Sequence, residues 1–294
     1  MAKKSRLSMV KLKSILNLIW GEFVYGGHLH SFGVASIVFV ASSLTGVKVT
    51  WDLLAVAYLG MHSVYLYNRY KEFNIDFITN PARTGYIKKY VKQIPLIIFV
   101  FTLTIASILL YYKNFLILIF AFLLLLMGIF YSEFLKKITK KIVGFKNLFI
   151  GLFFSSLIVL LALYYSVPWS ISLTMIFIFV FLRVFYNTVF FDIKDIESDK
   201  NENLLTLPIV LRGEKLIYFL DFINILSGIL IIVGVYFGFF PKFSLALLLA
   251  IPYSWYYLRK SKEPGVNIDF LSYVVADGEY TVWAFLILLG KIFL

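Results

Sequence analysis

The sequence contains no cysteine and few charged residues. Without cysteine, the chain can form no disulfide and has no thiolate to act as a nucleophile or metal ligand. Only 15% of its 294 residues are charged, whereas 61% are hydrophobic. This balance is far more apolar than that of a soluble domain and indicates an integral membrane protein. No linker or polar block of domain size interrupts the apolar segments, so we expect one transmembrane domain over residues 1–294.

Nine apolar segments are long enough to cross a membrane as helices, which takes about 20 residues each. We place them at 28–46, 50–68, 94–112, 114–132, 147–166, 168–190, 217–239, 241–258 and 270–290. Nearly all Lys and Arg residues fall in the N-terminal segment and in every second connection, which places the N-terminus in the cytoplasm and the C-terminus outside. We therefore expect an all-α, multi-pass membrane protein with nine transmembrane helices around a central cavity. Topology explains the net charge of +12, and we expect no nucleic-acid partner.

Two short stretches hold six of the 16 acidic residues, at the cytoplasmic ends of the second and sixth segments. In a continuous helix, the residues of each stretch would share one face, because successive residues turn by about 100°. Two such helices facing each other could close oxygen ligands around a hard cation, and Mg²⁺ suits carboxylates combined with phosphate oxygens. The candidate ligands are Asn68, Glu72, Asp76, Asp192, Asp195 and Asp199.

These stretches resemble the two signatures of the UbiA-type intramembrane prenyltransferases. The second signature is D-x-x-D-x-x-x-D followed by a T-L-P segment, and here it reads Asp192, Asp195 and Asp199 followed by Thr206-Leu207-Pro208. Asn68 to Asp76 is similar to the first signature, N-D-x-x-D-x-x-x-D. The segments 80–85 and 131–136, with Lys146-Asn147 shortly after, also resemble family features, so the likeness covers nearly the whole chain.

The resemblance implies an enzyme of isoprenoid biosynthesis that binds an isoprenyl diphosphate through Mg²⁺, ionises it, and transfers the allylic group to an acceptor at the membrane. The Lys and Arg distribution predicts that its active site lies at the cytoplasmic side. The resemblance also implies that the six candidate ligands hold the metal and that Arg83, Lys136 and Lys194 contact phosphate oxygens. The chain departs from the first signature at Arg69, where the family usually has Asp, and at Glu72, which replaces Asp. Arg69 could engage the diphosphate directly, since a guanidinium forms bidentate contacts with phosphate.

Further polar and aromatic residues are candidates for the substrate cavity. Tyr131, Tyr186 and Asn187 could line it, and Arg183 could approach the carboxylates from the sixth segment. Ionisable residues at membrane depth, which also include Asp277 and Glu279, normally mark a cavity or a paired site. For His28 and His30 we expect a structural or interfacial role.

Three functions remain open. A prenyltransferase would need a hydrophobic or amphipathic acceptor: a lipid alcohol, a quinone precursor without a carboxylate, or a polyene. An aromatic acid is not expected, because the Arg-containing segment typical of family members that use 4-hydroxybenzoate is missing. A terpene cyclase on the same scaffold would act on the isoprenyl diphosphate alone. A transporter or non-catalytic lipid-binding protein is the alternative from another class.

Overall fold

The computed structural model describes residues 15–112 and 115–294, and all regular structure within these ranges is helical. A first helix, Ile15–Tyr25, precedes the long ones. The long helices are α2 (His28–Thr45), α3 (Trp51–Lys71), α6 (Ile94–Tyr112), α7 (Phe115–Glu133), α8 (Phe145–Tyr164), α9 (Ile171–Lys194), α12 (Glu214–Tyr236) and α15 (Asp277–Phe293). Shorter elements are α4 (Phe73–Thr79), α5 (Pro81–Ile87), η1 (Val91–Gln93), η2 (Leu135–Lys140), α10 (Ile196–Asn201), α11 (Leu207–Val210), η3 (Lys242–Leu249), α13 (Ala250–Lys260), α14 (Ile268–Phe270) and the π-helical turn η4 (Leu271–Ala276).

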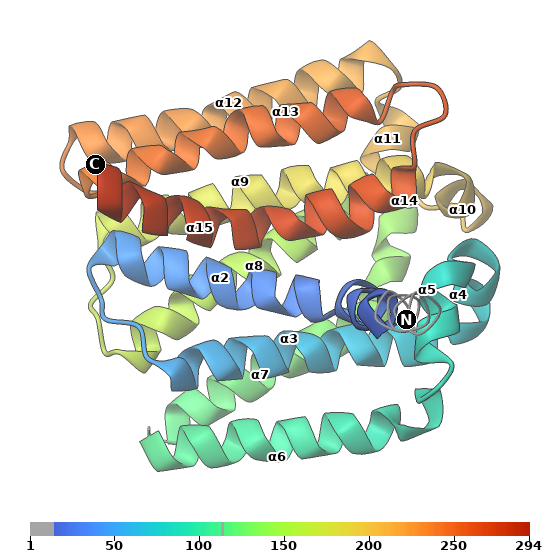
Figure 1. Ribbon diagram of the computed structural model, residues 1–294, viewed down its shortest axis with the longest axis horizontal. Helices are drawn as coiled ribbons and strands as arrows, with labels where there is room; N and C mark the ends of the chain where they lie inside the picture. Colours follow the sequence, from blue (N-terminus) through green and yellow to red (C-terminus); the bar gives the residue numbers. More distant parts are fainter. Residues whose placement is uncertain (1–14, 113–114) are drawn as a thin grey trace, which may run out of the picture.

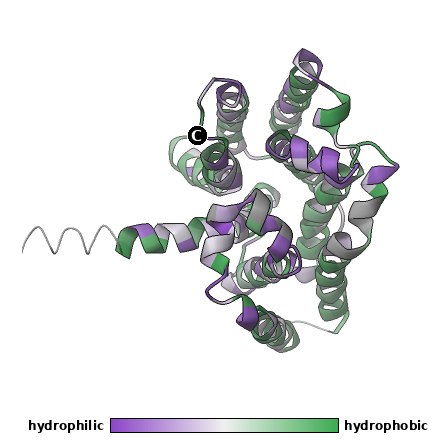
Figure 2. Cartoon of the chain, turned by 90° about the vertical axis from the view of Figure 1, so that its right-hand side faces the viewer, coloured by the Kyte–Doolittle hydropathy of each residue, from purple (hydrophilic) through white to green (hydrophobic). Residues whose placement is uncertain are grey.

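The long helices run side by side along the longest axis of the molecule (Figure 1). The short helices α4, α5, α10 and α11 gather at one end, on the right of Figure 1, and the C-terminus lies at the opposite end. Seen from the short-helix end, hydrophilic residues collect on these short elements, whereas the long helices behind them are mainly hydrophobic (Figure 2). The polar surface of the protein is therefore concentrated at the end of the helix bundle that carries the acidic motifs.

A helical segment coincides with each of the nine predicted spans within the described residues, with ends that differ by a few positions. Six of these segments are long and apolar enough to cross a membrane. The other three are α3, which carries polar residues along its length, α7, whose apolar part covers only Phe115–Tyr131, and the region of η3 and α13, which is divided between two kinds of helix. Nine crossings, and the orientation of the termini, thus stay predictions.

Close helix packing brings the two acidic motifs together. Helix α8 packs against α9, α2 against α15, and α3 against both α6 and α7. At the α3–α7 crossing, a Cβ atom on Gly128 would lie 2.6 Å from the side chain of Val64. Because no larger residue fits there, Gly128 permits the close approach that forms one wall of the cavity described below.

Helix α9 carries the second acidic motif to the short-helix end. It begins after Pro168, where the side-chain oxygen of Ser170 accepts a hydrogen bond from the backbone N–H of Leu173 at 3.3 Å and caps the first turn. The helix then continues to Lys194, several residues beyond the predicted end of this span. Asp192 consequently lies in its last turn and faces the protein interior.

Candidate active site

A cavity of about 310 Å³ lies at the short-helix end and brings both acidic motifs to one place. We call it the polar cavity. Its lining includes all six predicted metal ligands, namely Asn68, Glu72, Asp76, Asp192, Asp195 and Asp199. The structure therefore satisfies the geometric requirement for a shared site, because two motifs about 120 residues apart in the sequence face the same space.

Neither motif lies on a single continuous helix, contrary to the expectation from their spacing. Helix α3 ends and α4 begins at Glu72, whose backbone has φ −89° and ψ 9°. Helix α9 ends and α10 begins at Asp195, with nearly the same angles, φ −96° and ψ 11°. This sparsely populated backbone region often contains active-site residues. Each motif therefore bends at its middle residue, by the same local conformation, and its last residue, Asp76 or Asp199, reaches the cavity from a short helix.

In the first motif, two arginines hold Asp76. Arg69 donates to Asp76 Oδ2 at 2.5 Å and to Glu72 Oε2 at 3.4 Å, while Arg83 donates to Asp76 Oδ1 at 2.8 Å. The guanidinium groups are further ordered by aromatic rings, since Arg69 lies 5.6 Å from the ring centre of Tyr65. The Nε atoms of both arginines are buried and have no hydrogen-bond partner among the described residues. Because both arginines line the polar cavity, an anion bound there would meet their guanidinium groups.

In the second motif, the carboxylates outnumber the cations that pair with them. Asp192 is fully buried and accepts from Lys146 Nζ at 2.6 Å and from Asn147 Nδ2 at 2.7 Å. Asp195 lies 3.5 Å from Lys194 Nζ. Asp199 is buried, and its Oδ2 atom has no hydrogen-bond partner within the described part of the chain.

Burial is the largest cause that raises the pKa of Asp199 to about 6; Lys146 opposes this shift, and the negative charges of Asp192 and Asp195 reinforce it. A cation beside Asp199 would offset both the cost of burying its negative charge and the repulsion from Asp192 and Asp195.

The two motifs differ in how well their residues suit Mg²⁺. No three carboxylate or imidazole side chains in the described part of the chain converge as a complete metal site would require. Mg²⁺ usually binds one or two carboxylates together with substrate phosphates and water, so a complete protein cage is not needed. The second motif provides such carboxylates, including the unpartnered Asp199 oxygen. In the first motif, both Asp76 oxygens already bind guanidinium groups, which makes Asp76 a poor metal ligand.

The comparisons with known proteins agree with this architecture. The model of the UbiA prenyltransferase family matches residues 29–270. The chain belongs to this family. UbiA family members are prenyltransferases, so the protein is an enzyme that transfers prenyl groups.

Three solved structures share the UbiA fold at low sequence identity. A UbiA homologue from Aeropyrum pernix K1 is 14% identical, with a TM-score of 0.69 over 90% of this chain and 97% of that chain. A UbiA homologue from Archaeoglobus fulgidus, bound to GPP and Mg²⁺, is 13% identical, with a TM-score of 0.65 over 92% and 98% of the chains. A digeranylgeranylglyceryl phosphate synthase is 18% identical, with a TM-score of 0.57 over 94% and 98%. No curated protein matches the chain closely enough to count as a relative.

The structure places three predicted substrate-binding residues, Arg183, Tyr186 and Lys194, outside the lining of the polar cavity of this UbiA protein. Arg183 is fully buried and binds Glu279, Asn224 and Ser254, which lie on α15, α12 and α13. Tyr186 is also fully buried and donates to the backbone oxygen of Ser254 at 3.1 Å. Arg183 precedes Asp192 by nine residues, or two and a half helical turns, so it points away from the cavity side of α9.

The remaining predicted residues differ in their relation to the cavity. Tyr131 lines it and stacks on Phe149 with ring centres 5.1 Å apart. Its buried hydroxyl has no partner among the residues that the structure describes. Asn187 also contributes to the lining, and its amide donates to the backbone oxygen of Ala276 at 2.9 Å. Lys194 is absent from the lining, but it donates to Oδ1 of the lining residue Asn80 at 2.7 Å. The side chain of Lys136 lies outside the described residues.

Several residues of the site were not predicted as site residues from the sequence. Lys146 lines the cavity, and its neighbour Asn147 supports the wall, since both bind Asp192. Both had a sequence signal, because they follow the family-like segment 131–136. Tyr273 had no sequence signal, because it reaches the site from a helix almost 200 residues away from the first motif. His30 and Asp277 also line the cavity, and their side chains form a hydrogen bond with each other.

Proposed function

We propose that this protein transfers an isoprenyl group from an isoprenyl diphosphate to a hydrophobic acceptor in the membrane. One observation carries the proposal: a single cavity joins two guanidinium groups that have unpartnered donors to a carboxylate cluster with excess negative charge. An anion and a divalent cation bound together, as in a metal diphosphate, match this charge distribution. The bound GPP and Mg²⁺ in the Archaeoglobus fulgidus homologue support the same ligand class.

Arg69 and Arg83 would bind the diphosphate on the side of the first motif. Each already uses part of its guanidinium group to bind Asp76, which fixes the orientation of the remaining N–H donors. In this role, Asp76 positions the two arginines and is no metal ligand. Lys146 adds a further cation on the opposite side, where it pairs with Asp192.

Asp192, Asp195 and Asp199 would hold Mg²⁺ on the side of the second motif. When bound, the ion stabilises the negative charge that develops on the diphosphate as the C1–oxygen bond breaks. The chain contributes the carboxylates, and Lys146 and Asn147 fix the orientation of Asp192.

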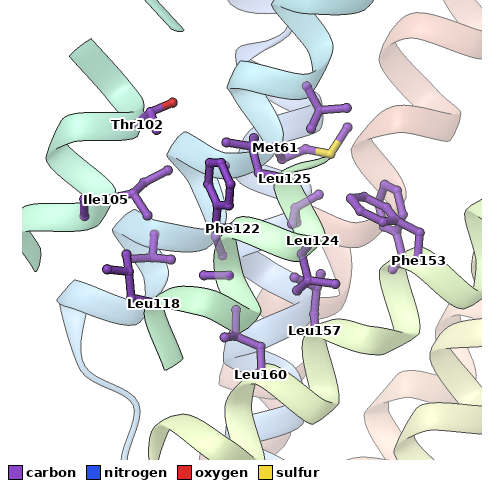
Figure 3. Close-up of a pocket in the computed structure, with 18 residues that line it drawn as sticks. Met61, Thr102, Ile105, Leu118, Phe122, Leu124, Leu125, Phe153, Leu157 and Leu160 are labelled. Atoms are coloured by element: carbon purple, nitrogen blue, oxygen red, sulfur yellow. The ribbon is translucent and has the colours of Figure 1, made fainter. Parts of the chain in front are cut away.

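An apolar pocket of about 90 Å³ adjoins the polar cavity and suits the isoprenyl tail. The two spaces share the lining residues Met61, Val64, Phe153 and Phe154. Figure 3 shows side chains such as Leu118, Phe122 and Leu157 surrounding this apolar pocket, with Thr102 as its one labelled hydroxyl-bearing side chain. A hydrocarbon tail would be removed from water along this path while its diphosphate stays in the polar cavity.

The active site would open to the cytoplasm, because the Lys- and Arg-rich connections lie at the same end as the polar cavity. There the C1–oxygen bond would break with its electron pair passing to the diphosphate, and the acceptor would supply the electrons of the new bond to C1.

Binding of geranylgeranyl thiodiphosphate, which resists ionisation, tests this proposal directly. The purified protein should bind it with Mg²⁺, and Arg83→Met should weaken binding at least tenfold because a charged hydrogen bond is lost. Arg212→Met is the matched control, since Arg212 is exposed and does not line the cavity. Equal effects of the two variants, or no binding at all, would contradict the proposal.

Incubation with geranylgeranyl diphosphate and Mg²⁺ alone separates transferase from cyclase. A transferase releases little product until an acceptor is added, whereas cyclic hydrocarbon or alcohol identified by mass would indicate a cyclase.

A further inference from the structure

His30 and Asp277 form a pair in the wall of the polar cavity, apart from both acidic motifs. His30 lies in the first turn of α2, and Asp277 is the first residue of α15. His30 Nδ1 is 3.1 Å from Asp277 Oδ1, and the two side chains are 20% and 16% exposed. Both line the cavity, so a molecule bound there can reach them.

The pairing defines which nitrogen of His30 is available. An ionised carboxylate only accepts hydrogen bonds, so Nδ1 carries the proton that it donates to Asp277. Nε2 is then the basic nitrogen of the ring. Among the described residues, none forms a hydrogen bond with Nε2. Phe154 and Tyr65, with ring centres 5.8 and 6.4 Å from that of His30, pack around the imidazole and hold its orientation.

A π-helical turn sets the position of Asp277. The turn Leu271–Ala276 immediately precedes it, and side chains from other helices bind the backbone oxygens of this turn. Tyr253 donates to Val275 O at 2.8 Å and Asn187 donates to Ala276 O at 2.9 Å. Such turns often occur at functional sites. This one lets Tyr273 and Asp277 face the same cavity.

Glu279, two residues further along α15, shows what a purely structural carboxylate looks like in this protein. It is fully buried, and Arg183, Tyr257 and Trp283 all donate to it. It does not line the cavity. The partly exposed pair of His30 and Asp277 therefore differs from a satisfied buried network in both position and accessibility.

The pair lies next to the place proposed for the diphosphate. Both neighbour the ring of Tyr65: Arg69 lies 5.6 Å from its centre, and the His30 ring centre lies 6.4 Å from it. A group one aromatic ring away from the diphosphate-binding arginines is placed to meet an acceptor that approaches C1.

We propose that His30, oriented by Asp277, is the general base that removes a proton from a hydroxyl acceptor, an inference that rests on the proposed function. A hydroxyl oxygen becomes a strong nucleophile only as its proton leaves, whereas a double bond attacks a carbocation before it loses any proton. A preformed base in the cavity thus favours an alcohol or phenol over a polyene.

In the transfer step, the C1–oxygen bond of the diphosphate breaks and its electron pair leaves with the diphosphate. A lone pair of the acceptor oxygen forms the new bond to C1, and the acceptor proton passes to His30 Nε2. The carboxylate of Asp277 stabilises the resulting imidazolium. The proton then returns to water or leaves with the diphosphate.

The test compares two probe acceptors with tritiated geranylgeranyl diphosphate and Mg²⁺: 1-O-hexadecylglycerol, which has hydroxyl groups, and squalene, which has only double bonds. The wild-type protein should form an ether with the alkylglycerol and no product with squalene. His30→Gln should lower ether formation at least about 100-fold, the usual contribution of a general base, and Asp277→Asn about tenfold.

Two readouts separate this role from a structural one. Binding of geranylgeranyl thiodiphosphate should be unchanged in His30→Gln, and the label should shift from ether to geranylgeraniol, because water captures the allylic group that the acceptor no longer attacks. His28→Gln is the matched control: His28 stacks on His62 and is absent from the cavity lining, so this variant should behave as wild type.

Wild-type rates in His30→Gln, transfer to squalene, or no ether from wild-type protein that binds the thiodiphosphate would overturn the general-base assignment. Failure of the wild-type protein to bind the thiodiphosphate would instead overturn the proposed function.

Discussion

Replacing Gly60 with leucine tests whether the apolar pocket holds the isoprenyl tail. Gly60 lies on α3 and lines this pocket, and a Cβ atom added there would meet no atom within 4 Å. A larger side chain can therefore enter the pocket without displacing its neighbours. Leucine is also a much better helix former than glycine, by roughly 1 kcal/mol, so the variant should not lose stability.

The expected effect depends on how much of the tail the leucine displaces. An isoprene unit has five carbons, and at about 0.8 kcal/mol per buried CH₂ its full displacement costs at most about 4 kcal/mol. Since about 1.4 kcal/mol corresponds to a tenfold change in Kd, complete displacement weakens binding several hundredfold. Displacement of only a third of the isoprene unit still weakens binding of the ligand about tenfold.

Chain length provides the discriminating measurement. Calorimetric titration of thiodiphosphates with geranyl, farnesyl and geranylgeranyl tails should show weaker binding in Gly60→Leu for the longer tails and little change for the shortest tail that stops before Gly60. Leu103→Phe is the control, because Leu103 is 51% exposed on α6 and does not line the pocket. An equal loss for all three tails, or no loss for any, would refute the assignment of the pocket.

Four other changes have defined outcomes. Asp195→Asn should weaken Mg²⁺-dependent thiodiphosphate binding at least about tenfold with little change in Tm, because Asp195 is 35% exposed and carboxylates are the ligands that Mg²⁺ prefers; unchanged Mg²⁺ dependence would contradict its role. Arg69→Asp should increase the number of Mn²⁺ ions bound with inorganic pyrophosphate from one to two in electron paramagnetic resonance, and equal counts would contradict the idea that the Arg69 charge replaces one metal ion. The pKa of Asp199 is about 6 in the folded protein, above its ordinary value. Between these two pKa values, the folded state keeps a proton that the unfolded state has lost. The contribution of this residue to the stability of the metal-free protein is therefore lost as pH rises through 6. Thermal unfolding should show this trend, with Mg²⁺ reversing it and Asp199→Asn removing it. Glu279→Gln should destabilise the protein by about 3–5 kcal/mol because it leaves the buried Arg183 without its counter-ion, and Arg183→Met/Glu279→Gln should recover part of the lost Tm.

The long apolar segments made the helices predictable from the sequence. Each predicted span meets a helix in the described residues because about 20 consecutive apolar positions have few other stable structures in a membrane. The bends at Glu72 and Asp195 were not predictable, since neither position has the Gly or Pro that usually marks a break. The π-helical turn before Asp277 also has no recognisable local pattern.

The candidate site could be predicted only where its residues are close together in the sequence. Regular spacing identified the two acidic motifs, and the lining of the polar cavity contains both. The pairing of His30 with Asp277 spans 247 residues, so no local spacing could indicate it. Arg183 shows the opposite error: its sequence distance from Asp192 suggested proximity, but half a helical turn directs it to the other side of α9.

The charge of the polar cavity explains why Arg69 can stand where related motifs have Asp. Exchanging Asp for Arg raises the local charge by two units, which equals the charge of one Mg²⁺ ion. The exchanged residue lies at the proposed diphosphate side, bound to Asp76 and Glu72, whereas the second motif keeps more carboxylates than cations. A tethered guanidinium is present at any Mg²⁺ concentration, and it also donates directional hydrogen bonds. Under the proposed function, the protein would combine one fixed organic cation site with one metal site, and part of its affinity for diphosphate should persist when Mg²⁺ is removed.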